Sequence, residues 1–252
     1  MIRRFNRFEL KYIVDHRLRD VLVEEMLLNM RPDSHGDGAG AYRVSSLYYD
    51  SADHACFWAK IEGLKYRRKL RVRVYGEDTA GDDVTGMVEI KQRINRTVQK
   101  RRVALPLNDA YALIEQGADF SWEDDRDRAV AHEVVSLVGS LHLQPACVIS
   151  YLRQAFVGGD YETGLRITFD SELSCRGPEY GLGAGAPKHF FISPDIMVME
   201  VKVNDTVPLW VARMLNRHNC QLQRISKYCA GIARLAALPY ADLAETIAAE
   251  GL

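Results

Sequence analysis

Cysteine is sparse in this sequence of 252 residues, and its arrangement lacks the features of a disulfide framework or a zinc site. The five cysteines are an odd number, are widely spaced and include no C-x-x-C pair. Reduced thiols are therefore expected, and these are typical of a cytoplasmic protein.

Long apolar runs are also missing. No apolar stretch approaches the roughly 20 residues that a membrane-spanning helix needs. The basic start of the chain leads into Glu9 and Lys11 rather than into the apolar segment of a signal peptide. We therefore expect a soluble, cytoplasmic chain, for which any link to a membrane depends on a separate membrane-protein partner.

The sequence has no excess of either charge sign. Its 33 Lys and Arg residues are balanced by 34 Asp and Glu residues, giving a formal net charge of -1. Proteins that bind nucleic acid usually have a basic total, so no nucleic-acid partner is expected. Any site for a polyanion has to be built by the local arrangement of the basic residues.

What the sequence does have is enough apolar material, 47% of its residues, for one large core. We find no internal repeat and no linker long enough to separate two parts, so we expect a single domain over residues 1–252. Asp15 is expected to cap the first helix, which should run out near Arg31 and Pro32. Strands are expected at 5–14, 42–50, 66–75, 85–94, 97–105, 147–157, 164–170 and 190–203. Further helices are expected at 53–62, 108–116, 122–141, 207–217, 226–238 and 241–249. This order predicts an α+β fold around a largely antiparallel sheet.

The expected strands carry their charges on one face. Side chains alternate between the faces of a strand, so Lys69, Arg71 and Arg73 lie opposite Leu70 and its apolar neighbours. At least six strands share this pattern. If helices cover the apolar faces, the charged faces look into a common interior. That interior would hold six more cations than anions: Lys11, Arg71, Arg73, Lys91, Lys100, Arg102, Arg153, Arg166 and Lys202 against Glu9, Glu89 and Glu200.

Two interpretations fit these charged faces. The plainer one is an open sheet whose basic face is solvated, and for any single strand it is the better one. Six strands biased toward Lys and Arg favour an enclosed interior instead. Because each desolvated charge costs several kcal/mol unless it is paired, such an interior requires a polyanion ligand.

A series of short charged and aromatic motifs runs along the chain. The first half carries them as R-F-E-L-K-Y (7–12), S-L-Y-Y-D (46–50), K-L-R-V-R-V-Y-G (69–76), V-E-I-K-Q-R (88–93) and V-Q-K-R-R-V (98–103). The second half carries S-Y-L-R-Q-A-F (150–156), G-L-R-I-T-F-D (164–170), V-M-E-V-K-V (198–203) and S-K-Y-C-A-G (226–231). In their order and spacing, these motifs resemble the VTC (vacuolar transporter chaperone) domain of the triphosphate tunnel metalloenzymes. The resemblance covers residues 3–238.

The resemblance implies an eight-stranded antiparallel β-barrel, the triphosphate tunnel, with helices packed on its outside. It implies Glu200 as the ligand of Mn²⁺ or Mg²⁺. The implied tunnel cations are Lys11, Arg71, Arg73, Lys91, Lys100, Arg153, Arg166, Lys202 and Lys227. Only the resemblance points to Lys227, which falls in an expected helix. One departure is that Arg7 takes the first place of the superfamily's E-x-E-x-K signature, which VTC-type members tolerate.

The implied activity is a polyphosphate polymerase, an ATP:polyphosphate phosphotransferase that passes the γ-phosphate of ATP to a growing chain. We expect the transferred phosphate among Arg71, Arg73, Lys91, Arg153 and Arg166, because phosphoryl transfer depends mainly on positioning and charge neutralisation. The remaining cations, which are Lys11, Lys100, Lys202 and Lys227, would steer nucleotide or product.

Several alternatives stay open. A hydrolase of tripolyphosphate or nucleoside triphosphates could use the same fold with water as the acceptor. A module that binds polyphosphate or nucleic acid without turnover is a second alternative, although a retained metal carboxylate at Glu200 argues against it. Glu9 and Glu89 are expected to be structural partners of the cations rather than metal ligands. Arg93 and Arg102 could be rim residues that are merely solvated.

Overall fold

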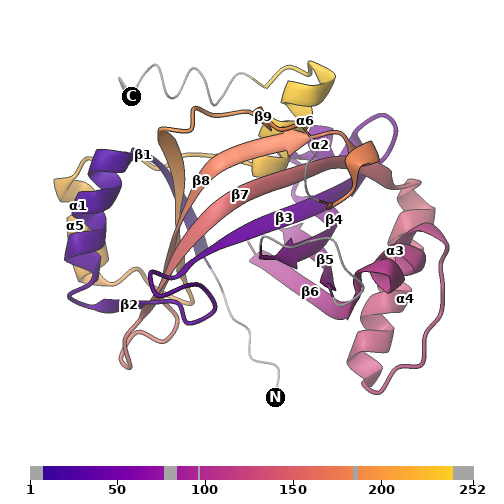
Figure 1. Ribbon diagram of the computed structural model, residues 1–252, viewed down its shortest axis with the longest axis horizontal. Coiled ribbons are helices and arrows are strands. Elements are labelled where there is room, and N and C mark those ends of the chain that lie inside the picture. Colours follow the sequence, from indigo (N-terminus) through magenta and orange to yellow (C-terminus); the bar gives the residue numbers. More distant parts are fainter. Residues whose placement is uncertain (1–7, 77–83, 96, 184–186, 241–252) are drawn as a thin grey trace.

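The structure, a computed structural model, describes residues 8–76, 84–95, 97–183 and 187–240 (Figure 1). One sheet of ten strands organises them, with eight strands in the order β1-β10-β8-β7-β3-β4-β5-β6. Every paired strand is antiparallel to its neighbour, and the short strands β2 and β9 pair at the side with β7 and β8. The α+β class and the antiparallel sheet are therefore confirmed.

The elements follow one another along the chain with the following bounds. The first half contains β1 (Phe8–Asp15), α1 (His16–Met26), β2 (Met30–Pro32), β3 (Ala41–Asp50), α2 (Ala55–Ile61), β4 (Tyr66–Tyr75), β5 (Thr85–Ile94), β6 (Thr97–Pro106) and α3 (Leu107–Glu115). The second half contains α4 (Asp125–Leu141), β7 (Gln144–Gly158), β8 (Arg166–Arg176), the 3₁₀ turn η1 (Pro178–Tyr180), β9 (His189–Phe190), β10 (Ile196–Val203), α5 (Leu209–Arg217) and α6 (Lys227–Ala236).

The expected closed barrel of eight strands is wrong. The sheet has ten strands, and β1 and β6 stand at the two ends of its order without hydrogen-bonding to each other in the described residues. Alternation in a sequence reports which face a side chain occupies. It does not fix the strand tilt and the shear on which barrel closure depends.

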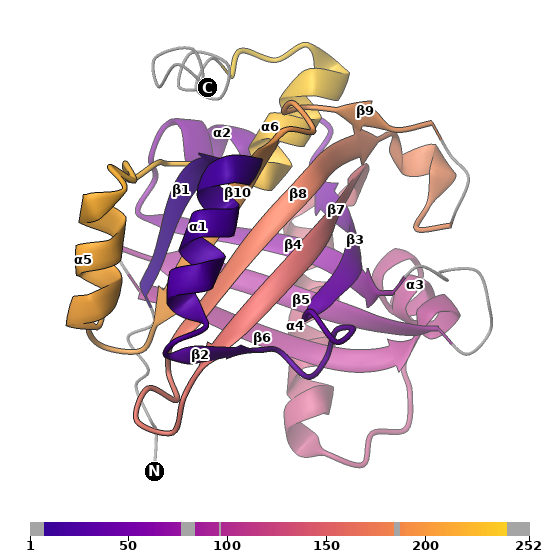
Figure 2. The same ribbon diagram turned by 60° about the vertical axis from the view of Figure 1, so that its left-hand side comes forward.

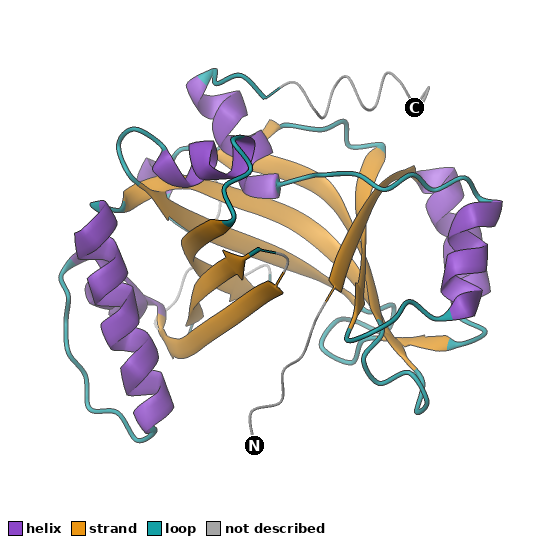
Figure 3. Cartoon of the chain, turned by 180° about the vertical axis from the view of Figure 1, so that it is seen from behind, coloured by secondary structure: helices purple, strands orange, loops and turns teal. Residues whose placement is uncertain are grey.

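The sheet is nevertheless so strongly curved that its concave face forms an interior (Figures 1 and 3). Five strands separate β1 from β5 in the sheet order, yet Nζ of Lys91 on β5 lies 3.4 Å from Oε2 of Glu9 on β1. A flat sheet would hold these side chains far apart, because neighbouring strands are spaced by about 4.8 Å. The expected common interior for the charged faces is therefore present without backbone closure.

Helices cover the convex, apolar face in two groups. The first group, α1 and α5, lies side by side (Figure 2) and packs on a core that includes Leu22, Ile167 and Met214. Arg217 of α5 ties the two helices together, since its Nη1 donates to Glu25 of α1 at 2.8 Å. The second group, α3 and α4, packs on β5 and β6 over a core that includes Val88 and Val134. None of the helices in the described ranges is long and apolar enough to cross a membrane.

Helix α6 departs from the expected arrangement of helices on the outside. It packs on β7 and β8, and the backbone of Gly231 comes so close to Ile149 and Cys175 that an added Cβ would collide with Ile149 Cδ1. Ile149 and Tyr151 lie on the same face of β7 as Arg153, which is the concave face. Helix α6 thus lies at one end of the interior and brings Lys227, the first residue of its first turn, to the charged residues.

The expected helix starts are mostly right and the ends less so. Asp15 caps α1, because its Oδ1 accepts from the backbone N–H of Leu18 at 2.7 Å. The helix ends at Met26, however, and residues 30–32 form the short strand β2 on the edge of β7. The expected helix at 241–249 and the start of the first expected strand, residues 5–7, lie outside the described residues.

Candidate functional site

The strands β4 and β5 place their basic side chains directly opposite one another. The backbone register pairs Arg73 with Met87, Arg71 with Glu89 and Lys69 with Lys91. Strand β6 adds Lys100 opposite Lys91. The result is one row of three lysines from three neighbouring strands, next to a row that contains Arg71 and Glu89. Period-2 alternation in the sequence predicted these faces, and the register supplies the cross-strand rows.

Glu89 neutralises part of this side of the site. Its Oε2 accepts from Nη2 and Nε of Arg71 at 2.6 and 2.8 Å, and its Oε1 pairs with Nζ of Lys100. Burial alone would raise the pKa of Glu89, but Arg71, Arg73 and Lys100 together lower it to about 2. Glu89 is therefore a charged partner of the cations, as expected, rather than a free ligand.

Hydroxyl groups hold the two arginines of β4. Nε of Arg73 donates to Oγ of Ser46 at 3.0 Å, and Nη2 of Arg73 donates to the hydroxyl of Tyr151 at 3.0 Å. Nη1 of Arg71 donates to the hydroxyl of Tyr48 at 2.8 Å. Ser46 and Tyr151 were not among the site residues expected from the sequence. Both lie at positions of their strands that face the concave side, and this alternation was the sequence feature that could have identified them.

Glu200 lies at the centre of the other side of the site and is surrounded by cations. Its carboxylate oxygens lie 2.6 Å from Nζ of Lys202, 2.6 Å from Nζ of Lys227 and 3.2 Å from Nζ of Lys11. Nη2 of Arg153 approaches to 3.5 Å. Burial opposes the charged form, but Lys11, Lys202 and Lys227 hold the pKa of Glu200 well below its ordinary value. Glu200 therefore stays ionised although it is only 4% exposed.

Asp170 is the acidic residue that the charge count of the sequence analysis left out. It is fully buried and accepts two hydrogen bonds of 2.7 Å from Nε and Nη2 of Arg153, and its Oδ2 also pairs with Nζ of Lys227. Burial raises its pKa, but Arg153 and Lys227 lower it more strongly. A bidentate pair of this kind is among the strongest in proteins. Asp170 shares a strand face with Arg166 and Thr168, which was the signal that could have identified it.

Glu9 links the two sides of the site. Its Oε1 lies 3.1 Å from Nζ of Lys11, and its Oε2 lies 3.4 Å from Nζ of Lys91. Burial works against its ionisation, but Lys91 and Lys11 lower its pKa. The expectation that Glu9 pairs with interior cations thus agrees with these contacts.

Arg166 lies directly opposite Lys202 in the pairing of β8 with β10, but its guanidinium turns to Asp33. Its Nη2 donates to Oδ2 of Asp33 at 2.7 Å and to the hydroxyl of Tyr42 at 2.8 Å, while its Nε is buried without a partner in the described part of the chain. Asp33 is buried in the segment after β2, where the sequence offered no periodic pattern to reveal it. Four of the nine expected cations, which are Lys11, Arg153, Lys202 and Lys227, therefore contact Glu200. Arg71, Arg73, Lys91 and Lys100 come from β4, β5 and β6 and have other partners, and Arg166 is paired with Asp33.

Two lysines of the site release their protons more easily than usual. Burial lowers the pKa of Lys202 to about 8, with Arg153 adding to this effect and Glu200 opposing it. Burial also lowers the pKa of Lys100 to about 8, and here Glu89 opposes while Arg71 adds. Both shifts come mainly from burial, which disfavours the charged form of a lysine.

In the described ranges, no group of three His, Cys, Asp or Glu residues is placed to hold a metal ion. The donor set nevertheless suits a hard cation that arrives with phosphate, since Mg²⁺ is commonly held by one or two carboxylates together with substrate phosphates and water. Glu200 could supply that carboxylate once phosphates draw Lys11, Lys202 and Lys227 away from its oxygens.

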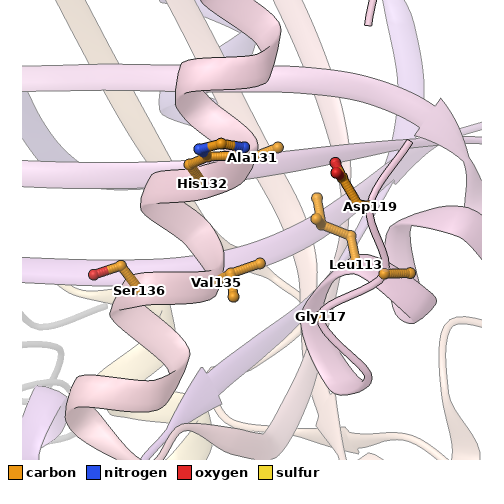
Figure 4. Close-up of a pocket in the computed structure, with 8 residues that line it drawn as sticks. Leu113, Gly117, Asp119, Ala131, His132, Val135 and Ser136 are labelled. Carbon is orange, nitrogen blue, oxygen red and sulfur yellow. The ribbon is translucent and has the colours of Figure 1, made fainter. Parts of the chain in front are cut away.

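One cavity lies away from these cations. It has a volume of about 380 Å³ and is lined by Leu113 of α3, by Asp119 of the segment after it, and by His132, Val135 and Ser136 of α4 (Figure 4). Its lining contains no Lys or Arg. This cavity therefore lacks the charge that a phosphate site requires.

Comparisons with known proteins agree with the motifs. The sequence pattern of the VTC domain family matches residues 6–236. Vacuolar transporter chaperone complex subunit 4 of Trypanosoma brucei brucei is 26% identical over 231 residues, and the protein of the same name from Trypanosoma cruzi is 23% identical over 227 residues. Each alignment covers 76% of this chain but 28% of the relative, so the chain spans little more than a quarter of their length.

Solved structures give a weaker likeness. A protein from Pyrococcus horikoshii aligns with 92% of this chain and 99% of its own, at 13% identity and a TM-score of 0.46. A putative adenylate cyclase from Bacillus halodurans aligns with 88% of this chain and 95% of its own, also at 13% identity, with a TM-score of 0.48.

Proposed function

Because the chain belongs to the VTC domain family, we propose that it is a polyphosphate polymerase, which transfers the γ-phosphate of ATP to the end of a growing polyphosphate chain. The observation that carries this proposal is the concave face. There, the cations outnumber the carboxylates and come from both sides of a curved sheet. A linear polyanion is the ligand class that such a face neutralises.

We assign the reacting phosphates to the cations at the centre of the face. Arg71 and Arg73 of β4 and Arg153 of β7 offer planar groups that bind two phosphate oxygens at once. Lys91 supplies a compact positive charge, and Arg166 reaches the same anion only if it leaves Asp33. Lys11, Lys100, Lys202 and Lys227 bind the remaining phosphates of the nucleotide or the product. Neutralising the oxygens in this way is the main task in phosphoryl transfer.

The reaction needs no general base. A terminal phosphate oxygen of the chain attacks the γ-phosphorus of ATP, and the bond from that phosphorus to the oxygen it shares with the β-phosphate breaks. ADP leaves with that oxygen, and the chain grows by one phosphate. The attacking oxygen is already an anion at neutral pH, so the protein binds and orients both reactants. When bound, Mn²⁺ or Mg²⁺ would neutralise further charge on the phosphates, and Glu200 is the residue that would hold it.

To test this proposal, purified protein is incubated with ATP and Mn²⁺, and the products are separated by chain length on a gel stained for polyphosphate. Long chains that exopolyphosphatase degrades, and that Arg71→Ala and Glu200→Gln each abolish, support the polymerase. Free phosphate without polymer would contradict it in favour of a hydrolase. No turnover, combined with tight binding of polyphosphate, would contradict it in favour of a binding module.

We also propose that the chain works together with other proteins. Both curated relatives are named as subunits of a complex, and more than two thirds of their length lies outside the matched region. A cytoplasmic domain that acts beside a membrane-protein partner fits this proposal. Co-purification of the tagged chain from its own cells, followed by identification of the bound proteins, tests it. Recovery of the chain alone would contradict it.

A further inference from the structure

The basic rows of β4 and β5 continue beyond the residues assigned to the reaction. After the row that contains Arg71 and the row that contains Lys69 and Lys91, the register places Arg67 directly opposite Arg93. These two arginines lie on the same face as Arg71, because they are an even number of residues away from the concave positions of their strands. Like charges that are directly opposite destabilise a sheet.

The cations of the inner rows have a carboxylate or an aromatic ring beside them, and the two arginines of the outer row have no carboxylate beside them in the described residues. Arg71 has Glu89 at 2.6 Å, Lys91 has Glu9 at 3.4 Å, and Lys69 lies 4.5 Å above the ring of Tyr228. In contrast, no carboxylate of the described ranges lies within 4 Å of the guanidinium of Arg67 or Arg93. Burial lowers the pKa of Arg67, and the charge of Arg93 lowers it further.

A pocket opens at this outer row. It has a volume of about 240 Å³ and is lined by Gly63, Leu64, Lys65, Arg67, Arg93 and Asn95. Its shape is set by the backbone, since the N–H of Asn95 donates to the carbonyl of Lys65 at 2.8 Å, and Nε of Arg93 donates to the carbonyl of Asn95 at 2.8 Å. Three cations and no carboxylate line it, a composition that fits an anion.

We propose that Arg67, Arg93 and Lys65 form a second anion site, which binds phosphates of a long polyphosphate chain at a distance from the reacting end. This inference rests on the proposed function for the identity of its ligand. Four residues of strand separate Arg67 from Arg71, which corresponds to about 14 Å. A ligand has to be extended over this distance to contact both sites, so the second site selects long chains over short ones.

The test is a binding measurement in the absence of ATP, which keeps it independent of turnover. Calorimetry compares tripolyphosphate with long-chain polyphosphate for the wild type, for Arg67→Ala/Arg93→Ala and for the control Arg126→Ala/Arg128→Ala on α4. We expect the first double variant to bind long chains about tenfold more weakly, with unchanged affinity for tripolyphosphate. The slope of log K against log salt should fall by roughly 1.4, the value for two lost phosphate contacts at about 0.7 each. The control should match the wild type.

Arg67→Lys/Arg93→Lys keeps both charges and should retain most of the affinity for long chains, which separates charge from folding. Equal weakening for both ligands, or no weakening for either, would overturn the second site. If single-stranded RNA binds as tightly as long polyphosphate and loses as much affinity in the alanine variant, the assignment to polyphosphate is wrong. If the wild type makes no polymer from ATP but shows the expected selective loss, the polymerase fails while the second site stands.

Discussion

On the side of the concave face formed by β1, β10, β8 and α6, three carboxylates (Glu9, Asp170 and Glu200) contact Lys11, Lys202, Lys227 and, from neighbouring β7, Arg153. We refer to this side as the compensated half. On the side formed by β4, β5 and β6, the carboxylate of Glu89 pairs with Arg71 and Lys100. We refer to it as the cationic half.

The difference between the halves teaches how one fold can be stable without its ligand and still bind a polyanion. In the compensated half, each carboxylate is paired with buried cations. Removal of one partner leaves a buried charge without its counter-charge, which is costly because the protein interior has a low dielectric constant. In the cationic half, charge remains for a ligand to neutralise. The compensated half therefore matters more for stability, and the cationic half matters more for affinity and rate.

The largest effect is expected from Arg71→Ala in the cationic half. It removes a planar donor from the assigned phosphates and leaves Glu89 with one cation fewer, so polymer formation should fall about 100-fold or more. Initial rates with ATP and Mn²⁺ measure this, and Arg128→Ala on the exposed face of α4 is the control. A rate within twofold of the wild type would remove Arg71 from the site.

Asp170→Asn in the compensated half should lower the free energy of unfolding by about 3 kcal/mol, because Arg153 and Lys227 then lose a buried counter-charge. Urea unfolding measures the loss. Added tripolyphosphate should recover part of it, since the ligand neutralises the same cations. Asp125→Asn, at an exposed position, serves as the control. An unchanged urea midpoint would show that the buried ion pairs of the compensated half do not stabilise the fold.

The affinity for tripolyphosphate should decrease at alkaline pH. A pKa of about 8 means that Lys202 loses its charge near pH 8, well below the ordinary range for lysine. If the ligand requires the charged form, affinity at pH 9 should be about tenfold lower than at pH 7, and binding should take up a proton. Calorimetry in buffers of different ionisation enthalpy detects this uptake. In Lys202→Arg the side chain is always charged, so the pH dependence should become weaker. An equal dependence in that variant would exclude Lys202 as its source.

The smallest effect concerns the packing of α6, which holds Lys227 in the compensated half. Gly231→Ala should lower the free energy of unfolding by about 1–2 kcal/mol, since the added methyl group meets Ile149 Cδ1. Gly139→Ala on α4 is the matched control. Nothing lies within 4 Å of its added methyl group, so it should be neutral or stabilising. If both variants behave alike, the close packing of α6 has no energetic role.

Alternation along the strands was sufficient to predict which residues share the concave face. It identified Arg71 and Glu89 correctly, because each lies at a regular place within a long strand whose other face is apolar. It could not predict the partners across the interior, such as Glu9 with Lys91, because these depend on the curvature of the whole sheet. It also could not place Lys227, which reaches the site from a helix.

Other features escaped the sequence for local reasons. Arg166 alternates correctly, but its partner Asp33 comes from an irregular segment, so its position on Asp33 has no periodic signature. The open sheet has a similar cause, since closure depends on tilt and shear rather than on the pattern of faces. The match to the VTC domain family establishes which family the chain belongs to. The variants above test the roles of the individual residues.

The most direct test of the central claim, that both halves bind one triphosphate group, is a crystal structure with a non-hydrolysable ATP analogue and Mn²⁺. The account predicts phosphate oxygens within hydrogen-bonding distance of Arg71 and Arg73 on one side and of Arg153 and Lys202 on the other. A triphosphate bound outside the concave face, or held by one half alone, would contradict it.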